Sequence, residues 1–182
     1  MSTHWTPARI TVAGAIGGMV GGVMYAMVVM LYGWASPGHR FWDPPMAIWA
    51  YVGGLSHYGD PANHVWPILL GIGGHMMNSM IVGVVIVGIL AMLRLRGLTA
   101  PTIAAAALGV AVWPLMRYVL LPLNTPEDRL FTTGIVSPQW AWWIGHVALG
   151  MGIGMVYALA ARRRTIRPAE LVRDEKLQSS AA

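Results

Sequence analysis

Four long stretches without a charged side chain constrain this chain more than any other feature. They cover residues 10–34, 65–93, 98–116 and 130–161. About 20 apolar residues are enough for a helix to cross the hydrocarbon layer of a bilayer. The runs are continuously apolar, whereas the strands of a membrane barrel alternate. The sequence therefore predicts an all-α, polytopic membrane protein with four transmembrane helices, at about 10–34, 66–93, 100–123 and 138–161.

The composition agrees with a membrane class. Hydrophobic residues make up 56% of the chain and charged residues 10%, whereas soluble domains carry roughly 25% charged residues. The chain has no cysteine, which excludes a disulfide framework and a thiolate metal site.

The basic residues are distributed by topology. One arginine precedes the first stretch, two join the second to the third, and most of the others follow the fourth: Arg9, Arg94, Arg96, Arg162, Arg163, Arg164, Arg167, Arg173 and Lys176. By the positive-inside rule, both termini and the 94–99 turn are cytoplasmic. We therefore expect a helical bundle over 1–161 in the bacterial cytoplasmic membrane and a basic tail over 162–182. The tail would meet anionic lipid headgroups and not nucleic acid.

The connection 35–65 is long for a bundle and would lie outside. Asp43 as cap and Pro44 as first helical residue predict a short apolar helix there, interfacial or re-entrant because about ten residues cannot span a bilayer. A belt of tryptophans is expected at this outer boundary. Its members are Trp42, Trp49, Trp66, Trp140, Trp142 and Trp143.

Two histidines occupy matching places in the second and fourth spans. His75 and His146 lie 71 positions apart, and a proline, two glycines and a methionine around each repeat at the same offset. This pattern predicts two tandem helical hairpins related by a parallel repeat. Both rings would lie near mid-membrane, where a polar group without a partner is costly.

These histidines support two interpretations. As ligands they could hold a haem b iron from both faces, with Arg117 on a propionate, nearby glycines leaving room for the macrocycle, and quinone as a partner. As packing groups they would bond a backbone carbonyl, a serine or Asn78 on a neighbouring helix.

A third interpretation uses the thioethers, which are soft ligands for Cu(I). Ten methionines lie in the first, second and fourth spans, and His39, His57 and His64 in the outer loop could capture the ion first. This pattern would suit a copper or small-solute permease. The spacings of the three outer histidines match no compact zinc motif.

Evidence for catalysis is lacking in the sequence. No HExxH, phosphate loop or nucleophile elbow occurs. The outer acids Asp43, Asp60, Glu127 and Asp128 flank turns and prolines, which favours capping, and no acid lies inside a predicted span. We therefore expect no catalytic activity of the chain's own, and no catalytic residues.

Glycines four apart form flat faces that allow close helix packing in lipid. The first span carries Gly14, Gly17, Gly18, Gly21 and Gly22, and the last carries Gly150 and Gly154. Together with the missing catalytic groups, these faces favour a non-enzymatic subunit or scaffold of an inner-membrane complex, packed against other membrane subunits or itself. A haem b and quinone electron-transfer subunit, and a permease, remain as alternatives.

The last span, WWIGHVALGMGIGMVYALA, carries Trp143, His146, Gly150, Gly154 and Tyr157. It resembles the final helix of small, mostly uncharacterised bacterial inner-membrane proteins with four helices, which reads G-W-x-x-H, then spaced glycines, then Tyr-Ala. Trp142 stands where that pattern has glycine. The resemblance implies a four-helix fold and an inner-membrane location, and no activity.

Overall fold

The computed structural model describes residues 5–124 and 128–179, with side chains described as far as Arg162. The described residues form helices and turns and no strands. Six α-helices follow in order, with single turns of 3-10 helix after α2: α1 (Pro7–Ala35), α2 (Asp43–Gly53), η1 (Leu55–His57), η2 (Pro61–Asn63), α3 (Val65–Met92), α4 (Thr99–Leu115), α5 (Arg129–Thr132) and α6 (Gln139–Ser179).

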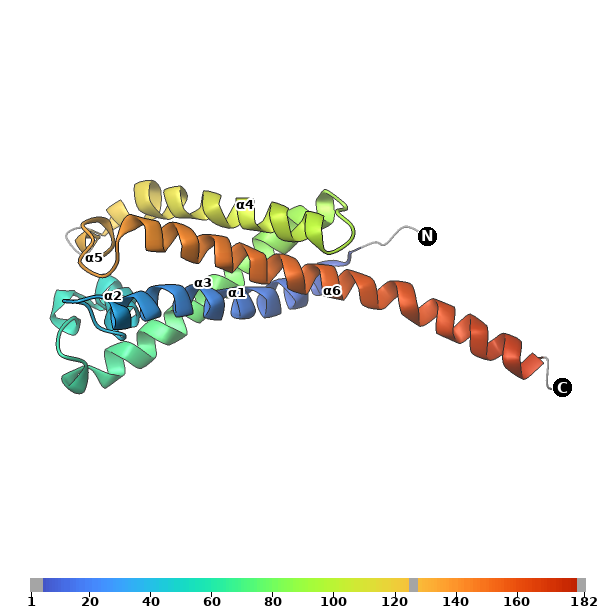
Figure 1. Cartoon of the computed structure of the whole chain (residues 1–182), viewed down its shortest axis with the longest axis horizontal. Coiled ribbons are helices and arrows are strands. Elements are labelled where there is room, and N and C mark those ends of the chain that lie inside the picture. The colour runs from blue at the N-terminus through green and yellow to red at the C-terminus, as the bar shows by residue number, and fades with distance from the viewer. Residues whose placement is uncertain (1–4, 125–127, 180–182) are drawn as a thin grey trace.

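Four helices are long and apolar enough to cross a membrane, as predicted. They cover Pro7–Ala35, Val65–Met92, Thr99–Leu123 and Gln139–Arg162. The first begins three residues before the expected start because Pro7 occupies the first turn, where its missing N–H has no intrahelical partner to lose. α6 does not end near 161 but continues as one helix to Ser179, beyond the rest of the bundle (Figure 1).

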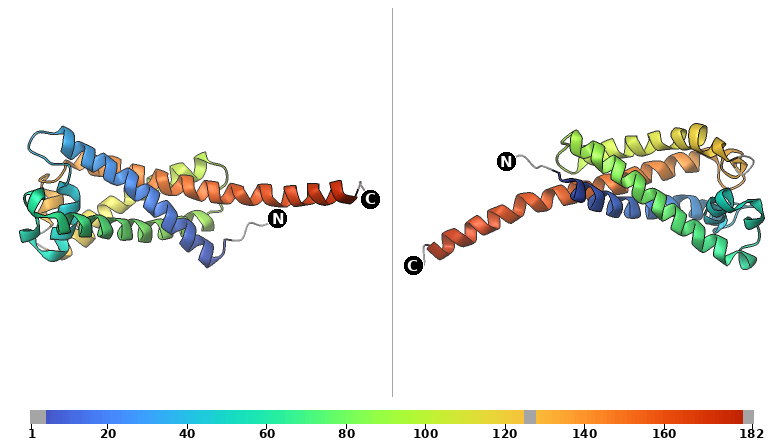
Figure 2. Two further views of the ribbon diagram at one scale, coloured as in Figure 1. Left: turned by 90° about the horizontal axis from the view of Figure 1, so that it is seen from below. Right: turned by 180° about the vertical axis from the view of Figure 1, so that it is seen from behind.

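α1 lies at the centre of the fold. It packs against α3 on one face and against α6 on another, while α4 packs mainly on α6. The views in Figures 1 and 2 show these helices running side by side. α3 and α4 are joined by a short turn but have little contact with one another.

The glycines of α1 explain how one helix serves two neighbours. A Cβ at Gly18 would collide with Ser79 and Met80 of α3, and one at Gly21 with Leu149 of α6. In the last helix, Gly150 is packed in the same way against Ala105 of α4. These faces bring backbones together inside the bundle, so they no longer argue for contacts with another subunit.

α2 packs into the half of the molecule that lies away from the termini (Figure 1). Met46, Ala47 and Ala50 are fully buried, mostly through contacts with α3. Tyr51 donates its hydroxyl proton to the carbonyls of Leu120 (2.8 Å) and Leu121 (3.1 Å), near the C-terminal end of the third span. The short helix predicted for this loop is therefore present and held against the bundle.

The role predicted for Asp43 as helix cap is wrong. Trp42 precedes the helix, and Asp43 is its first residue. Its buried carboxylate accepts hydrogen bonds from the Arg40 amide (2.8 Å) and guanidinium (2.9 Å), because an opposite charge is a stronger partner than a free helix amide. The Arg40 guanidinium lies 6.0 Å from the Tyr58 ring. Burial, reinforced by the Asp43 charge, raises the pKa of Tyr58 to about 12.

Pro114 interrupts the third span. It lies in the last turn of α4, which continues as a π-helical turn (Met116–Leu120) and a 3-10 turn (Leu121–Leu123). A proline cannot donate to the helical ladder, so the hydrogen-bond pattern changes there. π-Turns within helices are frequent at functional sites, and this one carries Arg117.

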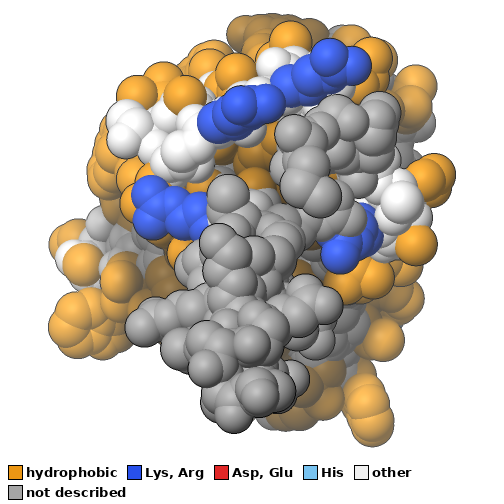
Figure 3. Space-filling view, turned by 90° about the vertical axis from the view of Figure 1, so that its right-hand side faces the viewer, with side chains coloured by type: hydrophobic (Ala, Val, Ile, Leu, Met, Phe, Trp, Pro, Cys, Tyr) orange, Lys and Arg blue, Asp and Glu red, His pale blue; other side chains and the backbone are white. Residues whose placement is uncertain are grey.

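The start of α1, the α3–α4 turn and the outgoing part of α6 lie at the same end of the bundle (Figure 1). Four arginines with described side chains belong to these segments: Arg9, Arg94, Arg96 and Arg162. Figure 3 looks onto this end and shows basic side chains gathered on a largely hydrophobic face.

Candidate functional site

His75 connects α3 to α1 in the middle of the membrane part. Its Nε2 lies 2.9 Å from the Gly22 carbonyl oxygen. A carbonyl can only accept, so Nε2 carries the proton and Nδ1 keeps a lone pair. The expectation of a backbone carbonyl as partner therefore matches the geometry at His75.

His146 is buried, with 6% of its surface exposed. Its Nδ1 donates to the Trp142 carbonyl oxygen, 2.7 Å away in the preceding turn of α6, which leaves the lone pair on Nε2. The ring of Trp113, from α4, lies 5.4 Å from the imidazole, centroid to centroid. The two histidines therefore differ in surroundings although their positions in the sequence correspond.

Both imidazoles pack against one side chain that the sequence analysis missed, Tyr25 of α1. Its ring centroid is 5.1 Å from that of His75 and 4.9 Å from that of His146, edge-on to the latter at 87°. The hydroxyl of Tyr25 has no hydrogen-bond partner among the described residues. The available signal was a phenol in the middle of an otherwise apolar span, one turn after Gly21 and Gly22.

Two tryptophans complete the cluster. Trp113 and Trp142 stack at 5.6 Å and 17°. The indole N–H of Trp142 donates to the Ser137 carbonyl (3.1 Å), whereas that of Trp113 is buried without a partner among the described residues. The placement of Trp142 in the outer belt is wrong: it is 2% exposed, because its indole turns inward onto Trp113 and Tyr25.

A cavity of about 150 Å³ lies beside Tyr25 and His75. α1, α2, α3 and α6 all contribute to its wall, which is almost entirely apolar and includes Met30, Pro45 and Met76. Residues at its edge such as Val23 and Met27 are about half exposed on the outer surface of the bundle. The cavity therefore opens toward the surrounding lipid.

These residues do not fit a haem. The space beside Gly145 is filled by the Tyr25 ring, and the space beside Gly71 by the Pro45 backbone. Arg117 lies against the Trp113 and Tyr118 rings, at 6.0 and 5.6 Å, with the Thr132 carbonyl 3.4 Å away. A cavity of about 150 Å³ holds a single benzene-sized ring, and a macrocycle would have to displace Tyr25.

The three histidines of the 35–65 connection do not meet in one place. His39 lies beside Tyr32 and His57 beside Trp49, and the two ring nitrogens of His64 lie 2.7 Å from the Asp60 carbonyl oxygen and 3.3 Å from that of Ser56. Over the described residues, no group of three His, Cys, Asp or Glu side chains could hold a metal ion. Glu127 lies outside the described residues.

The methionines are spread around the helices. Several are well exposed on the outside of the bundle, namely Met19, Met27, Met77 and Met151. Side chains that point outward from three different helices do not line a common path for an ion.

Fold and surface together indicate a multi-pass helical membrane protein, with an apolar exterior and a polar-aromatic cluster at its centre. When the chain is compared with protein-family models, with curated proteins and with solved structures, nothing matches.

Proposed function

We propose that this chain is a small subunit of the bacterial cytoplasmic membrane that binds a lipid-soluble ligand of the quinone class beside Tyr25. In this proposal both termini are cytoplasmic, and two tandem hairpins, α1–α3 and α4–α6, are related by a parallel repeat. The ligand reaches its site sideways from the lipid.

One observation carries the proposal: the Tyr25 hydroxyl has no partner among the described residues, yet Tyr25 lines an apolar cavity open to lipid. An unsatisfied donor at membrane depth costs several kcal/mol. A ligand with a carbonyl oxygen on an apolar body would accept this proton. A single-ring quinone matches both the polarity of the wall and a volume suited to one six-membered ring.

His75 adds a second polar contact. Since its Nε2–H donates to Gly22, its Nδ1 is left as an acceptor, and a quinol hydroxyl could donate to it. With a rotation of these side chains toward the cavity, whose wall is almost entirely apolar in this structure, the site would offer a donor to the oxidised ligand and an acceptor to the reduced one. The histidine acts here by hydrogen bonding and needs no metal.

The test is titration of the purified full chain with decylubiquinone, followed by tryptophan fluorescence, because Trp142 lines the cavity. Tyr25→Phe keeps the ring and removes the hydroxyl, so we expect about tenfold weaker binding, equivalent to about 1.4 kcal/mol. Tyr118→Phe, on a residue that is 71% exposed, is the matched control and should bind like the parent. Non-saturable quenching, or equal affinity in Tyr25→Phe, would refute the proposal.

A scaffold role is the second candidate, and the length of α6 favours it. The helix continues from Arg162 to Ser179, which corresponds to about 25 Å at 1.5 Å per residue, and offers a rigid contact for another subunit. Size-exclusion chromatography with light scattering on gently solubilised membranes tests this role. A larger assembly that is lost on truncation after Arg164 supports it, and a monomer counts against it.

A further inference from the structure

A second cavity, of about 220 Å³, lies at the end of the bundle that carries the termini. Its wall combines Trp5 ahead of α1, the α3–α4 turn, and Tyr157 and Ala161 of α6. Candidate spans end at Met92 and Arg162, so the cavity lies at the level where apolar helices give way to water. Phospholipid phosphates occupy this level of a bilayer.

The floor of this cavity is formed by the buried ring of Tyr157. Tyr157 is 1% exposed and stacks on Trp5, with ring centroids 4.8 Å apart at 13°. Its hydroxyl lies 3.2 Å from the Leu90 carbonyl oxygen and 3.3 Å from that of Leu95. It thereby ties the last turn of α3 and the following loop to α6.

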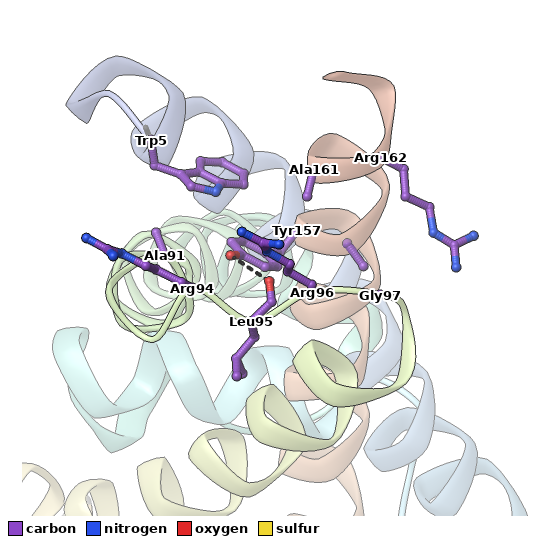
Figure 4. Close-up of a pocket in the computed structure, with 10 residues that line it drawn as sticks. Trp5, Ala91, Arg94, Leu95, Arg96, Gly97, Tyr157, Ala161 and Arg162 are labelled. Carbon is purple, nitrogen blue, oxygen red and sulfur yellow. Dashed lines mark hydrogen bonds between the residues drawn. The ribbon is translucent and has the colours of Figure 1, made fainter. Parts of the chain in front are cut away.

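Arginines surround the opening. Arg94, Arg96 and Arg162 all line the cavity. In the view of Figure 4 the Arg96 side chain overlaps Tyr157, and the Arg94 and Arg162 side chains extend to either side. Within the described part of the chain, Arg94 and Arg96 have no carboxylate partner, since the ion pair found there joins Arg40 to Asp43.

The backbone at Arg94 has a conformation that residues other than glycine rarely adopt. Arg94 has φ of 53° and is the one non-glycine residue with positive φ in the described chain. The Arg94 amide bonds the Ala91 carbonyl and the Leu95 amide bonds that of Leu90, the pattern of a helix end at which glycine is the usual left-handed residue. A side chain with a Cβ is strained there, and glycine would relieve the strain.

We propose that this cavity binds the headgroup of an anionic phospholipid, with its phosphate between Arg94 and Arg96 and its glycerol region against Trp5 and Tyr157. Guanidinium groups match phosphate oxygens in a bidentate manner. Basic pockets between transmembrane helices suit anionic headgroups, and the partly buried indole of Trp5 can lie at the headgroup level. The proposal does not depend on the ligand assigned to Tyr25.

Native mass spectrometry of the detergent-purified full chain can test this assignment by counting retained lipids. The protein is incubated with phosphatidylglycerol or with phosphatidylcholine. We expect preferential retention of one phosphatidylglycerol, and about tenfold lower retention in Arg94→Gly and in Arg96→Gln. Arg129→Gln, at the opposite end of the bundle, should retain the lipid like the parent.

Arg94→Gly separates binding from folding. Glycine suits the left-handed position, so the lipid-free variant should melt at the same temperature as the parent or higher, although it has lost the lipid. The assignment would be overturned if both cavity variants retained as much phosphatidylglycerol as the parent, or if the parent retained the two lipids equally. If inorganic phosphate displaced phosphatidylglycerol and raised the melting temperature as much as the lipid does, the ligand of the cavity would be a free phosphate ion and not a phospholipid.

Discussion

Gly18 of α1 and Ser79 of α3 are in direct backbone contact, and the Ser79 carbonyl fills the place that a Cβ on residue 18 would take. Gly83, one turn further along α3, meets α1 in the same way. Without a hydrophobic driving force between helices in lipid, such close contacts provide much of the packing energy. The contact therefore sets how closely the first two spans approach.

The first prediction concerns this contact. In Gly83→Ala the new methyl group would collide with the Gly14 carbonyl and would meet the Gly18 backbone at 2.7–2.8 Å, so α1 and α3 must move apart. We expect a loss of about 1–3 kcal/mol, as for other overpacked sites. Gly73→Ala, in the same helix but with nothing within 4 Å, is the control. Thermal unfolding in detergent should show a lower midpoint than that of the parent for Gly83→Ala and an unchanged midpoint for Gly73→Ala. Equal midpoints in the two variants would contradict the packing.

A second prediction compares the two stacked tryptophans. Trp142→Phe removes a hydrogen bond to Ser137, whereas Trp113→Phe removes an N–H with no partner in the described structure. Both substitutions replace one indole of the same stacked pair with a smaller phenyl ring. We therefore expect Trp142→Phe to cost about 1 kcal/mol more than Trp113→Phe. Denaturant titration in mixed micelles measures the difference, and the reverse order would mean that the indole of Trp113 has a partner.

A third prediction concerns the ion pair between Arg40 and Asp43 in the connection between α1 and α3. The Asp43 side chain is 3% exposed and that of Arg40 43%. Asp43→Asn leaves a half-solvated guanidinium without its partner, and we expect a cost of about 2 kcal/mol, below the range for fully buried pairs. Asp60→Asn is the control, because Asp60 caps an exposed turn through the Ala62 amide. Limited proteolysis of the 35–65 loop should accelerate only in Asp43→Asn.

The same loop gives a pH-dependent prediction. Because the pKa of Tyr58 is raised from 10.0 to about 12, the folded protein favours the neutral phenol. The resulting stability is fully present below pH 10 and is lost as the pH rises through 12. The tyrosinate absorbance of the parent minus that of Tyr58→Phe should titrate near pH 12. In Asp43→Asn this titration should move to lower pH, and an unchanged titration would exclude Asp43 as a cause.

A fifth prediction concerns topology. The chain has no cysteine, so single cysteines report their own surroundings. In intact cells, Ser56→Cys should react with a membrane-impermeant maleimide, and Thr99→Cys should react only after permeabilisation. The reverse pattern would place the termini outside.

The spans could be predicted because a charge-free run of sufficient length has few alternatives in a chain this apolar. Partners could not. The helical period tells which residues share a face, but not that Gly17 and Gly18 face different helices. Nor could the cluster around Tyr25 be found in this way: a phenol in an apolar span looks like core, and Trp142 looks like its neighbours Trp140 and Trp143. Choosing among them requires the rotation of each helix about its axis, which only tertiary packing determines.

The two-sided use of α1 also has a consequence for biogenesis. A chain that enters the bilayer from its N-terminus releases α1 first and α3 next, so the face bearing Gly14 and Gly18 can be covered early. The face bearing Gly17 and Gly21 waits for α6, the last helix to emerge. Until then the nascent protein exposes this glycine face to lipid or to the insertion machinery. Slow translation between α3 and α6 would lengthen the period in which another helix could occupy it.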